Sequence, residues 1–379
     1  MLPDDGGFLK SFFPAVTTAV LVVTCPCAIG LATPLAFDLA LASLRRGGVF
    51  VRDPDLLEKA RHVRRIVFDK TGTLTWGRLR VQPIREPEPA DRDLLFTLCS
   101  SSNHPVSVAI AHWLGAQTPA PRFLHALCVE EVVGQGMLTR FEGRELRLGS
   151  REFTFGDAPL GRDDGIVALT RDGHALAVFQ VEEDYRGGAD DEIRELAAAG
   201  YDLHLVSGDR PDRVLAAAAK LGFDPAAARG GVKPVDKARY VAELDRGDTM
   251  MVGDGLNDAE AFDAAFCAGT PALDRPVMPA RADFFYTGLG TGAVSRVLAT
   301  AERFHRVVRR NLGLAVLYYV VAVGLAASAH MTPLLCAILM PASSLLLIGY
   351  TMVAMRGPAD ATTAPDVAGP RPSPREVAA

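Results

Sequence analysis

The sequence has few cysteines and little net charge, and both shortages exclude classes of protein. Its six cysteines are scattered apart from Cys25 and Cys27, so they do not form the framework of a disulfide-stabilised secreted domain. The formal net charge of −5 lacks the basic excess of a nucleic-acid-binding protein. A glycine-rich phosphate loop with its lysine is also missing, so ATP binding cannot be argued from that motif. Because the net charge is slightly negative, we expect no nucleic-acid partner.

The chain has long apolar runs instead, and they lie at its two ends. The run 12–42 contains one charge, Asp38, and exceeds the roughly 20 residues that cross a bilayer. A cleaved signal peptide fits this run poorly because its basic start is almost absent and the run is too long. Two further runs cover 312–329 and 333–355. The pattern predicts three transmembrane helices around a soluble middle.

Arginines set the orientation of these helices. They cluster at one end of each run, as Arg45, Arg46, Arg52, Arg303, Arg306, Arg309, Arg310 and Arg356. By the positive-inside rule those ends face the cytoplasm. We therefore expect a multi-pass membrane protein, in the inner membrane if the source is bacterial, with its soluble domains in the cytoplasm and the lipid bilayer as a partner.

The segment 69–73, with the sequence Asp-Lys-Thr-Gly-Thr, organises the soluble part. It follows 65–68, a short apolar and β-branched run that is typical of a buried strand. Gly72 and the threonines predict a tight turn, so Asp69 should lie at the carboxyl end of a strand, where open α/β sheets bind ligands. An aspartate there can attack phosphorus and become an acyl phosphate, given Mg²⁺ and a cation on the transferred group.

Suitable partners for Asp69 follow later strands. Ser207-Gly208-Asp209 comes after the apolar run 203–206, and the sequence Gly-Asp-Gly-Leu-Asn-Asp at 253–258 comes after the run 249–252. Lys237 lies between these two segments. We expect all of them to converge on one edge of a parallel sheet. Each segment alone could be an ordinary surface turn, but their agreement favours a phosphoryl-transfer site.

The combination of Asp-Lys-Thr-Gly-Thr with Gly-Asp-Gly-x-Asn-Asp resembles the P-type ATPases. The resemblance implies an α/β haloacid-dehalogenase-like phosphorylation domain with an inserted α+β nucleotide-binding domain and three transmembrane helices. Ser207 stands where the family usually has threonine, which preserves the hydroxyl group. The implied site residues are Asp69, Lys237, Ser207 and Asp258 for catalysis, Asp69, Asp254 and the Thr71 carbonyl for Mg²⁺, and Asn257 beside the cofactor.

ATP would bind to the inserted domain. Residues 81–90 are rich in proline and charge and are interpreted as a linker, and 91–114 as helical. The family has Ser-Glu-His-Pro with its histidine against adenine, and here Asn103 replaces the acid beside His104. The resemblance places Gly134, Gly136 and Gly149 along the ATP pocket, where small residues suit close approach. A helix-end histidine and unrelated glycines are the alternative reading.

Cys25-Pro26-Cys27 followed by Pro34 matches the sixth transmembrane helix of the heavy-metal P-type ATPases. A proline kinks such a helix and frees carbonyls, and soft thiolates favour Cu(I) while also binding Zn²⁺. The alternative is that both thiols are small buried hydrophobes.

The last two apolar runs extend the comparison to the copper branch. Tyr318 matches its seventh helix, although Tyr319 replaces an asparagine, and Met340-Pro341-Ala342-Ser343-Ser344 matches its eighth. The lysine and aspartate of the zinc branch are missing from these runs. The resemblance implies that Cu(I) is bound by Cys25, Cys27, Met340, Tyr318 and Ser344.

The predicted organisation has six parts. They are a transmembrane helix with the Cys-Pro-Cys motif and a stalk (1–60), the phosphorylation domain (61–82 and 181–300), the nucleotide-binding domain (83–180), two transmembrane helices (301–356) and a disordered tail (357–379).

The resemblance implies the carboxyl-terminal portion of a pump that uses ATP to export Cu(I) through an aspartyl phosphate. The Thr-Gly-Glu loop of the actuator domain does not occur in the sequence, so a second polypeptide is one possible source of that domain. Two other readings stay open. One is a membrane-anchored haloacid-dehalogenase-type phosphatase, and the other is a non-catalytic metal-binding subunit of a split pump.

Overall fold

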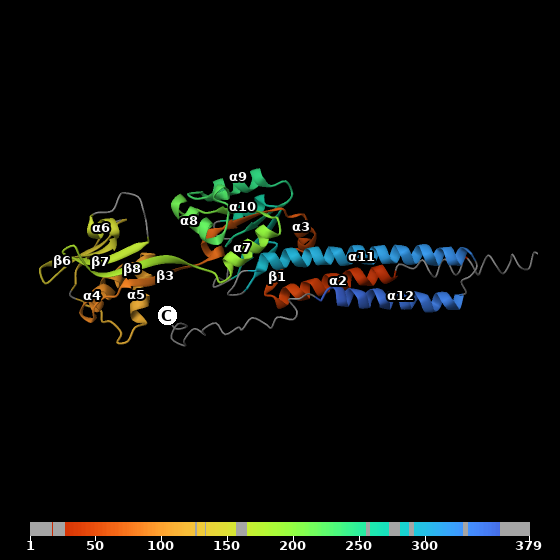
Figure 1. Ribbon diagram of the computed structural model, residues 1–379, viewed down its shortest axis with the longest axis horizontal. Helices are drawn as coiled ribbons and strands as arrows, with labels where there is room; N and C mark the ends of the chain where they lie inside the picture. Colours follow the sequence, from red (N-terminus) through yellow and green to blue (C-terminus); the bar gives the residue numbers. More distant parts are fainter. Residues whose placement is uncertain are drawn as a thin grey trace, which may run out of the picture. The chain divides into compact units, whose positions relative to one another are not determined.

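The computed structural model describes residues 17, 27–125, 127–132, 134–156, 165–254, 258–272, 281–287, 292–328 and 333–356. The predicted tail, the turn around Met331, and Cys25 lie outside these residues, as do the side chains of 27–29. The chain divides into two compact units, one built from Met1–Thr73 with Gly187–Ala379 and the other from Leu74–Arg186 (Figure 1).

The first unit contains a seven-stranded sheet with the order β1-β13-β12-β11-β2-β9-β10. Its neighbouring strands run parallel except that β1 pairs antiparallel with β13. The strands are β1 Val49–Val51, β2 Arg65–Asp69, β9 Asp202–Val206, β10 Ala228–Arg229, β11 Thr249–Val252, β12 Cys267–Pro271 and β13 Phe284–Tyr286. Strand β2 lies between β11 and β9, which places Asp69 at the centre of the carboxyl edge.

Helices cover this sheet because its central strands are apolar on both sides, as parallel sheets usually are. The helices are α3 Leu56–His62, α7 Ala189–Ala198, α8 Pro211–Leu221, α9 Pro234–Leu244 and α10 Ala259–Ala264, with a short 3₁₀ turn at Pro225–Ala227. Helices α9 and α10 share one apolar core with Val67, Val206 and Met251 of the sheet. Helices α8 and α9 begin with proline, whose fixed φ suits the first helical position.

Three helices of the same unit run side by side (Figure 1). They are α2 Cys27–Arg46, α11 Ala293–Ala327 and α12 Pro333–Ala354. Within the described residues, two segments are long and apolar enough to cross a membrane, Ala293–Ala326 and Leu334–Ala354. The third predicted span stays a prediction, because its first half falls outside the described residues and its second half is α2. Helix α11 passes uninterrupted through position 300, where a domain boundary was predicted.

Helix α11 receives the cap of its first turn from another helix. Its N-cap residue, Gly292, has no side chain to offer, and the first backbone N–H groups of any helix lack partners within that helix. Glu192 of α7 accepts hydrogen bonds on Oε1 from the backbone N–H groups of Val294 at 3.0 Å and Ser295 at 3.2 Å. Burial raises the pKa of Glu192, and the backbone donors partly offset that effect.

The second unit is a six-stranded antiparallel sheet with the order β3-β8-β7-β6-β5-β4. Its strands are β3 Thr75–Arg85, β4 Val129–Val132, β5 Gly136–Phe141, β6 Arg144–Ser150, β7 Ile166–Arg171 and β8 His174–Tyr185, and its helices are α4 Pro89–Ser100, α5 Pro105–Gly115 and α6 Arg151–Phe155. Helices α4 and α5 share an apolar core with β5 to β8.

The second unit differs from the sequence-based prediction in two places. The stretch interpreted as a linker from position 81 belongs to β3 as far as Arg85. The predicted helix 91–114 is two helices, because Pro105 cannot continue α4 and instead starts α5.

Candidate active site

Asp69 ends β2 and points into a cavity of about 380 Å³ at the carboxyl edge of the parallel sheet. The turn after it needs Gly72, whose φ of 74° lies in the left-handed region. The lining residues come from four chain segments and are Asp69, Thr71, Ser207, Gly208, Asp209, Val232, Pro234, Lys237, Asp254 and Asp258. The structure thus brings together the residues predicted for phosphoryl transfer, except Asn257, which lies outside the described residues.

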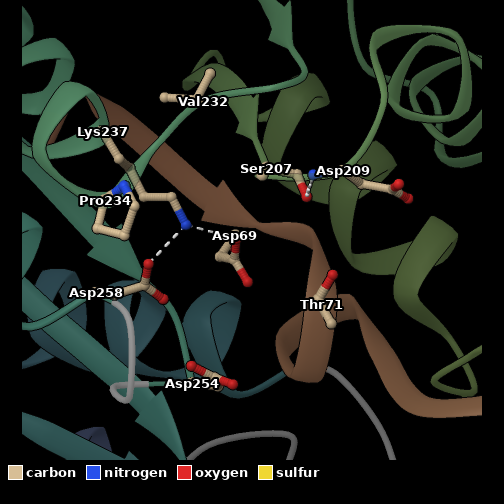
Figure 2. A pocket seen from close by; sticks show the side chains of 10 residues that line it. Asp69, Thr71, Ser207, Asp209, Val232, Pro234, Lys237, Asp254 and Asp258 are labelled. Carbon is tan, nitrogen blue, oxygen red and sulfur yellow. Dashed lines mark hydrogen bonds and ion pairs between the residues drawn. The ribbon is translucent and has the colours of Figure 1, made fainter.

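Lys237 joins the nucleophile to a second carboxylate (Figure 2). Its Nζ lies 2.7 Å from Asp69 Oδ1 and 2.6 Å from Asp258 Oδ1, and all three side chains are at most 8% exposed. A buried charge is tolerated when it is paired and hydrogen-bonded, and here one cation serves two anions. The lysine is therefore fixed beside the atom that would attack phosphorus.

Burial sets the protonation behaviour of this triad. Desolvation, helped by the nearby carboxylates of Asp258 and Asp254, raises the pKa of Asp69 to about 7 against the lowering effect of Lys237. Burial alone would lower the pKa of Lys237, but its two carboxylate partners outweigh burial and raise that pKa. Lys237 therefore remains a cation at neutral pH, and additional positive charge near Asp69 would favour the ionised nucleophile.

Oxygen atoms suited to Mg²⁺ lie on the other side of Asp69. Asp254 follows β11 and faces the turn that carries Thr71 (Figure 2). A side chain at Gly72 would place its Cβ 2.9 Å from Asp254 Oδ2, so glycine is what lets this carboxylate approach the turn. Carboxylate and carbonyl oxygens are the ligands that Mg²⁺ prefers. Asp69, Asp254 and the carbonyl of Thr71 therefore fit the ion that the sequence predicted.

The opposite wall contains an ion pair that the sequence analysis did not predict. Lys70 is 1% exposed and binds Asp209, which follows β9 in the cavity wall. Although burial opposes it, Lys70 holds the pKa of Asp209 below its ordinary value. The backbone N–H of Asp209 also donates to Ser207 Oγ at 3.2 Å. The opposite charges in the two motifs were the available signal for this pair.

Four of the residues predicted to bind nucleotide, His104, Gly134, Gly136 and Gly149, lie in the second unit, and Asn257 lies outside the described residues. Gly136 and Gly149 are register partners between β5 and β6, and a Cβ at Gly149 would lie 2.3 Å from the carbonyl oxygen of Gln135. His104 caps α5, because its Nδ1 accepts from the backbone N–H of Val106 at 3.3 Å. Gly134 adopts a φ of 74° in the turn before β5. Gly136 and Gly149 thus permit close backbone approach whether or not a ligand is bound, whereas Gly134 has open space around it.

The residues predicted to bind copper are only partly described. Cys25 lies outside the described residues, and Cys27 is described only as the first position of α2. Tyr318 lies on α11 and Met340 on α12, where the hydroxyls of Ser343 and Ser344 both donate to the Met340 carbonyl oxygen, at 2.8 and 3.0 Å.

These two helices are also joined by a buried polar contact that was not predicted. The side-chain amide of Asn311 on α11 donates to Thr351 Oγ1 on α12 at 2.8 Å, and both residues are at most 2% exposed.

Comparisons with known proteins agree with this geometry. The model of the family described as haloacid dehalogenase-like hydrolase matches residues 63–265. The nitrogen fixation protein FixI of Rhizobium meliloti is 34% identical over 336 residues, which cover 88% of this chain and 43% of the relative. A probable copper-exporting P-type ATPase V of Mycobacterium tuberculosis is 30% identical over 379 residues, which cover 91% of this chain and 47% of that protein.

A solved structure is similar in fold. The crystal structure of a zinc-transporting PIB-type ATPase in its E2.Pi state aligns with a TM-score of 0.69 and 24% identity, covering 88% of this chain and 57% of the other. The chain spans about half the length of the curated relatives it matches.

Proposed function

Because the chain belongs to the haloacid dehalogenase-like hydrolase family, and resembles the carboxyl-terminal portion of heavy-metal P-type ATPases, we propose that Asp69 accepts the γ-phosphoryl group of ATP. The observation that carries this proposal is the position of Lys237 Nζ, 2.7 Å from Asp69 Oδ1. A buried carboxylate at a sheet edge with a fixed ammonium group is suited to displacement at phosphorus.

The transfer makes one bond and breaks one. A carboxylate oxygen of Asp69 forms a bond to the γ-phosphorus, and the bond from that phosphorus to the bridging oxygen breaks, so that ADP leaves with the electron pair. Lys237 stays protonated throughout and moves its hydrogen bonding from Asp69 to the transferred phosphoryl oxygens. Ser207, directly after the neighbouring strand β9, offers a hydroxyl donor to the same group. Bound Mg²⁺ would neutralise phosphate charge and orient the oxygens.

Among its described residues, the same pocket offers no carboxylate that is suited to act as the general base for hydrolysis of the acyl phosphate. A general base must be free to take a proton from water. Among the carboxylates of the described cavity besides Asp69, Asp258 is paired with Lys237, Asp209 is paired with Lys70, and Asp254 is assigned to Mg²⁺ in this proposal. We therefore infer that dephosphorylation needs an actuator-type domain from another part of the polypeptide or from a second polypeptide. Sustained turnover by this sequence alone at ordinary enzyme rates, about 10 s⁻¹, would contradict that inference.

Trapping the phosphoenzyme tests the assignment. The protein is incubated with γ-labelled ATP and Mg²⁺, quenched in acid, and treated with hydroxylamine, which cleaves acyl phosphates. The parent should carry an acid-stable, hydroxylamine-labile label that Asp69→Asn abolishes. Asp263→Asn, an exposed aspartate of α10, serves as the matched control and should label normally. A label that persists in Asp69→Asn would refute the assignment. Rapid hydrolysis of small phosphate esters instead would favour a phosphatase.

We further propose that phosphorylation drives Cu(I) across the membrane, with the catalytic units in the cytoplasm. The support is chemical. A Cys-Pro-Cys motif on one helix and Met340 on another offer two thiols and a thioether, the soft ligands that Cu(I) prefers. The runs 312–329 and 333–355 contain no acidic residue, so they offer a hard cation no carboxylates. The relative from Mycobacterium tuberculosis is described as probably copper-exporting.

Competition for Cu(I) against a chelator in detergent tests the cargo. Cys25→Ser and Cys27→Ser should each weaken Cu(I) binding by about tenfold or more, and Met340→Leu should weaken it less, because a thioether is the weaker ligand. Met352→Leu, an exposed methionine on the same helix, is the control and should bind as the parent does. Equal affinity for Zn²⁺, or silent cysteine changes, would rule out the copper assignment without touching the phosphorylation chemistry.

A further inference from the structure

We propose that His204 and Tyr240 form a positioning pair that holds helix α9 in register on the sheet and thereby places Lys237 on Asp69. The inference rests on the proposed phosphoryl transfer to Asp69. Neither residue lines the cavity described above, and neither belongs to a predicted motif. Their role follows from where β9 and α9 place them.

The pair is a partly buried hydrogen bond between a strand and a helix. His204 of β9 is 8% exposed, and its Nδ1 lies 2.8 Å from the Tyr240 hydroxyl on α9. The rings meet edge to face, with centroids 5.9 Å apart and an angle of 71° between planes. The Arg229 guanidinium lies over the Tyr240 ring at 4.8 Å from the centroid. Tyr240 is therefore held at its hydroxyl and at its ring.

Sheet register connects this pair to the nucleophile. Asp69 is the register partner of Val206, and Val67 is the partner of His204, so His204 lies two positions before the level of Asp69. Residues two apart on a strand share a face and lie about 6.6 Å apart. His204 therefore lies on the sheet face of Asp69, one step back from the carboxyl edge. Val67 and Val206 of that face share a core with α9.

The spacing on α9 matches the spacing on the sheet. Lys237 and Tyr240 are three positions apart, so they share one helix face and differ by about 4.5 Å along the axis. Lys237 reaches Asp69, and Tyr240 reaches His204 below it. Two contacts at different positions along α9 fix both its translation along the helix axis and its rotation about that axis. The Lys237 contact alone fixes neither.

The remaining contacts of the pair explain why the hydroxyl matters. His204 Nε2 lies 3.3 Å from Asp202 Oδ1 without the alignment of a hydrogen bond, so the Tyr240 hydroxyl is the well-formed partner of the ring. The loop before α9 is anchored separately, since the Val232 N–H donates to the Ser207 carbonyl at 3.0 Å. Removing the hydroxyl would therefore take away the polar anchor of α9 one turn beyond Lys237, while the apolar contacts of α9 with the sheet remain.

Phosphoenzyme kinetics test the proposal in the full chain. Tyr240→Phe should slow phosphorylation at saturating ATP about tenfold with the apparent KM for ATP unchanged, because a small displacement of Lys237 affects the transition state and not nucleotide binding. His204→Ala should act similarly, and His204→Asn, which retains a hydrogen-bonding group near the position of Nδ1, should recover most of the rate. Arg239→Ala, an exposed change on the same helix, should leave the rate unchanged.

Two further measurements keep the test independent of folding and of the ATP chemistry. The double variant His204→Ala/Tyr240→Phe should be no slower than either single variant, because the pair acts as one unit. Beryllofluoride with Mg²⁺ mimics a phosphoryl group on aspartate without ATP, and Tyr240→Phe should weaken its binding about tenfold. If the unmutated protein binds beryllofluoride but forms no phosphoenzyme, the proposed phosphorylation by ATP is wrong. The positioning claim is then tested by beryllofluoride affinity alone.

The positioning claim fails if Tyr240→Phe lowers the melting temperature while its phosphorylation rate and beryllofluoride affinity equal those of the parent. It also fails if the two single effects multiply in the double variant. Should Tyr240→Phe fail to fold, the comparison of His204→Ala with His204→Asn decides the question in the same assays.

Discussion

The two sheets of this protein place their predicted functional residues in different ways. The parallel sheet gathers charged side chains at one edge, where Lys237 is buried between Asp69 and Asp258. The antiparallel sheet places glycines where strands approach closely, such as Gly136 opposite Gly149. Parallel strands all end at the same edge, so residues distant in sequence converge there. In the antiparallel sheet, strands that follow one another in the sequence pair directly, so the residues that face each other are close in sequence.

This difference predicts what mutation should do in each unit. Changes at the parallel edge should abolish chemistry through unpaired charge, and changes in the antiparallel sheet should distort a surface through backbone clashes. Four predictions probe that contrast, in decreasing order of expected effect.

Lys237→Met should produce the largest loss. Asp69 and Asp258 would then repel each other without a cation, which raises the pKa of Asp69 further and protonates the nucleophile. Phosphoenzyme formation should fall by about a thousandfold, and the free energy of unfolding by about 3 kcal/mol. Quench-flow labelling and chemical denaturation measure the two effects. Adding Asp258→Asn should recover part of the stability and none of the rate, and recovery of both would show that Lys237 serves structure alone.

Gly149→Ala should damage the second unit without touching Asp69. The new Cβ would lie 2.3 Å from the Gln135 carbonyl oxygen, so β5 and the preceding turn must move. We expect a loss of about 2 kcal/mol and weaker ATP binding by calorimetry, with beryllofluoride binding at Asp69 unchanged. Gly115→Ala, at the open end of α5, is the matched control. Normal ATP binding by Gly149→Ala would contradict the clash.

Glu192→Ala removes a buried carboxyl group of the first unit that does not line the pocket and that caps α11. Removing the acceptor leaves the Val294 and Ser295 N–H groups of α11 without their cap, which should cost about 1 to 2 kcal/mol. Hydrogen exchange at these two amides should accelerate while phosphoenzyme formation persists. Glu195→Ala, an exposed change on the same helix, is the control. Unchanged exchange in Glu192→Ala would refute the cap.

The smallest effect should come from a half-exposed pair on the first unit. Lys59 Nζ lies 2.6 Å from Asp53 Oδ2 and 2.9 Å from Asp283 Oδ1, and Lys59 lowers the pKa of Asp53 to about 2. A depressed carboxyl pKa stabilises the fold above the unfolded value of 3.8, and this stabilisation is lost as pH falls through about 2. Solvent screening leaves about 1 kcal/mol.

Asp53→Asn tests that pair by its pH dependence. The variant should be about 1 kcal/mol less stable than the parent at pH 7, and the difference should shrink once the pH falls below about 4. Denaturation curves across that range measure it, with Asp55→Asn, a change at an exposed aspartate nearby, as the control. A constant difference at all pH values would mean that the charge of Asp53 contributes nothing.

The sequence predicted the pocket well because its determinants are local. The apolar run before Asp69 specified a strand, Gly72 specified the turn, and a parallel sheet left one place for the later motifs to meet. The family resemblance carried by these motifs is confirmed by the matching family model and by the P-type ATPase relative. The assignment of individual site residues and of the domain limits stays a prediction.

Contacts between distant positions could not be read from the sequence. Glu192 caps a helix through the N–H of Val294, 102 positions later, and His204 meets Tyr240 only because α9 packs on β9. The linker interpretation was wrong for another reason. It rested on the proline and charge content of 81–90, but Pro83 lies in β3, the edge strand of its sheet, where proline is tolerated because one side needs no ladder hydrogen bond.

Chemical trapping of the acyl phosphate tests the central claim most directly. Borohydride reduces an aspartyl phosphate to homoserine, and mass spectrometry of the peptide that contains Asp69 locates the change. We predict conversion at Asp69 when both ATP and Mg²⁺ are present, and no conversion when either is omitted or when Lys237 is replaced by methionine. Conversion at another aspartate, or an unmodified Asp69 in a protein that binds ATP and Mg²⁺, would contradict the account.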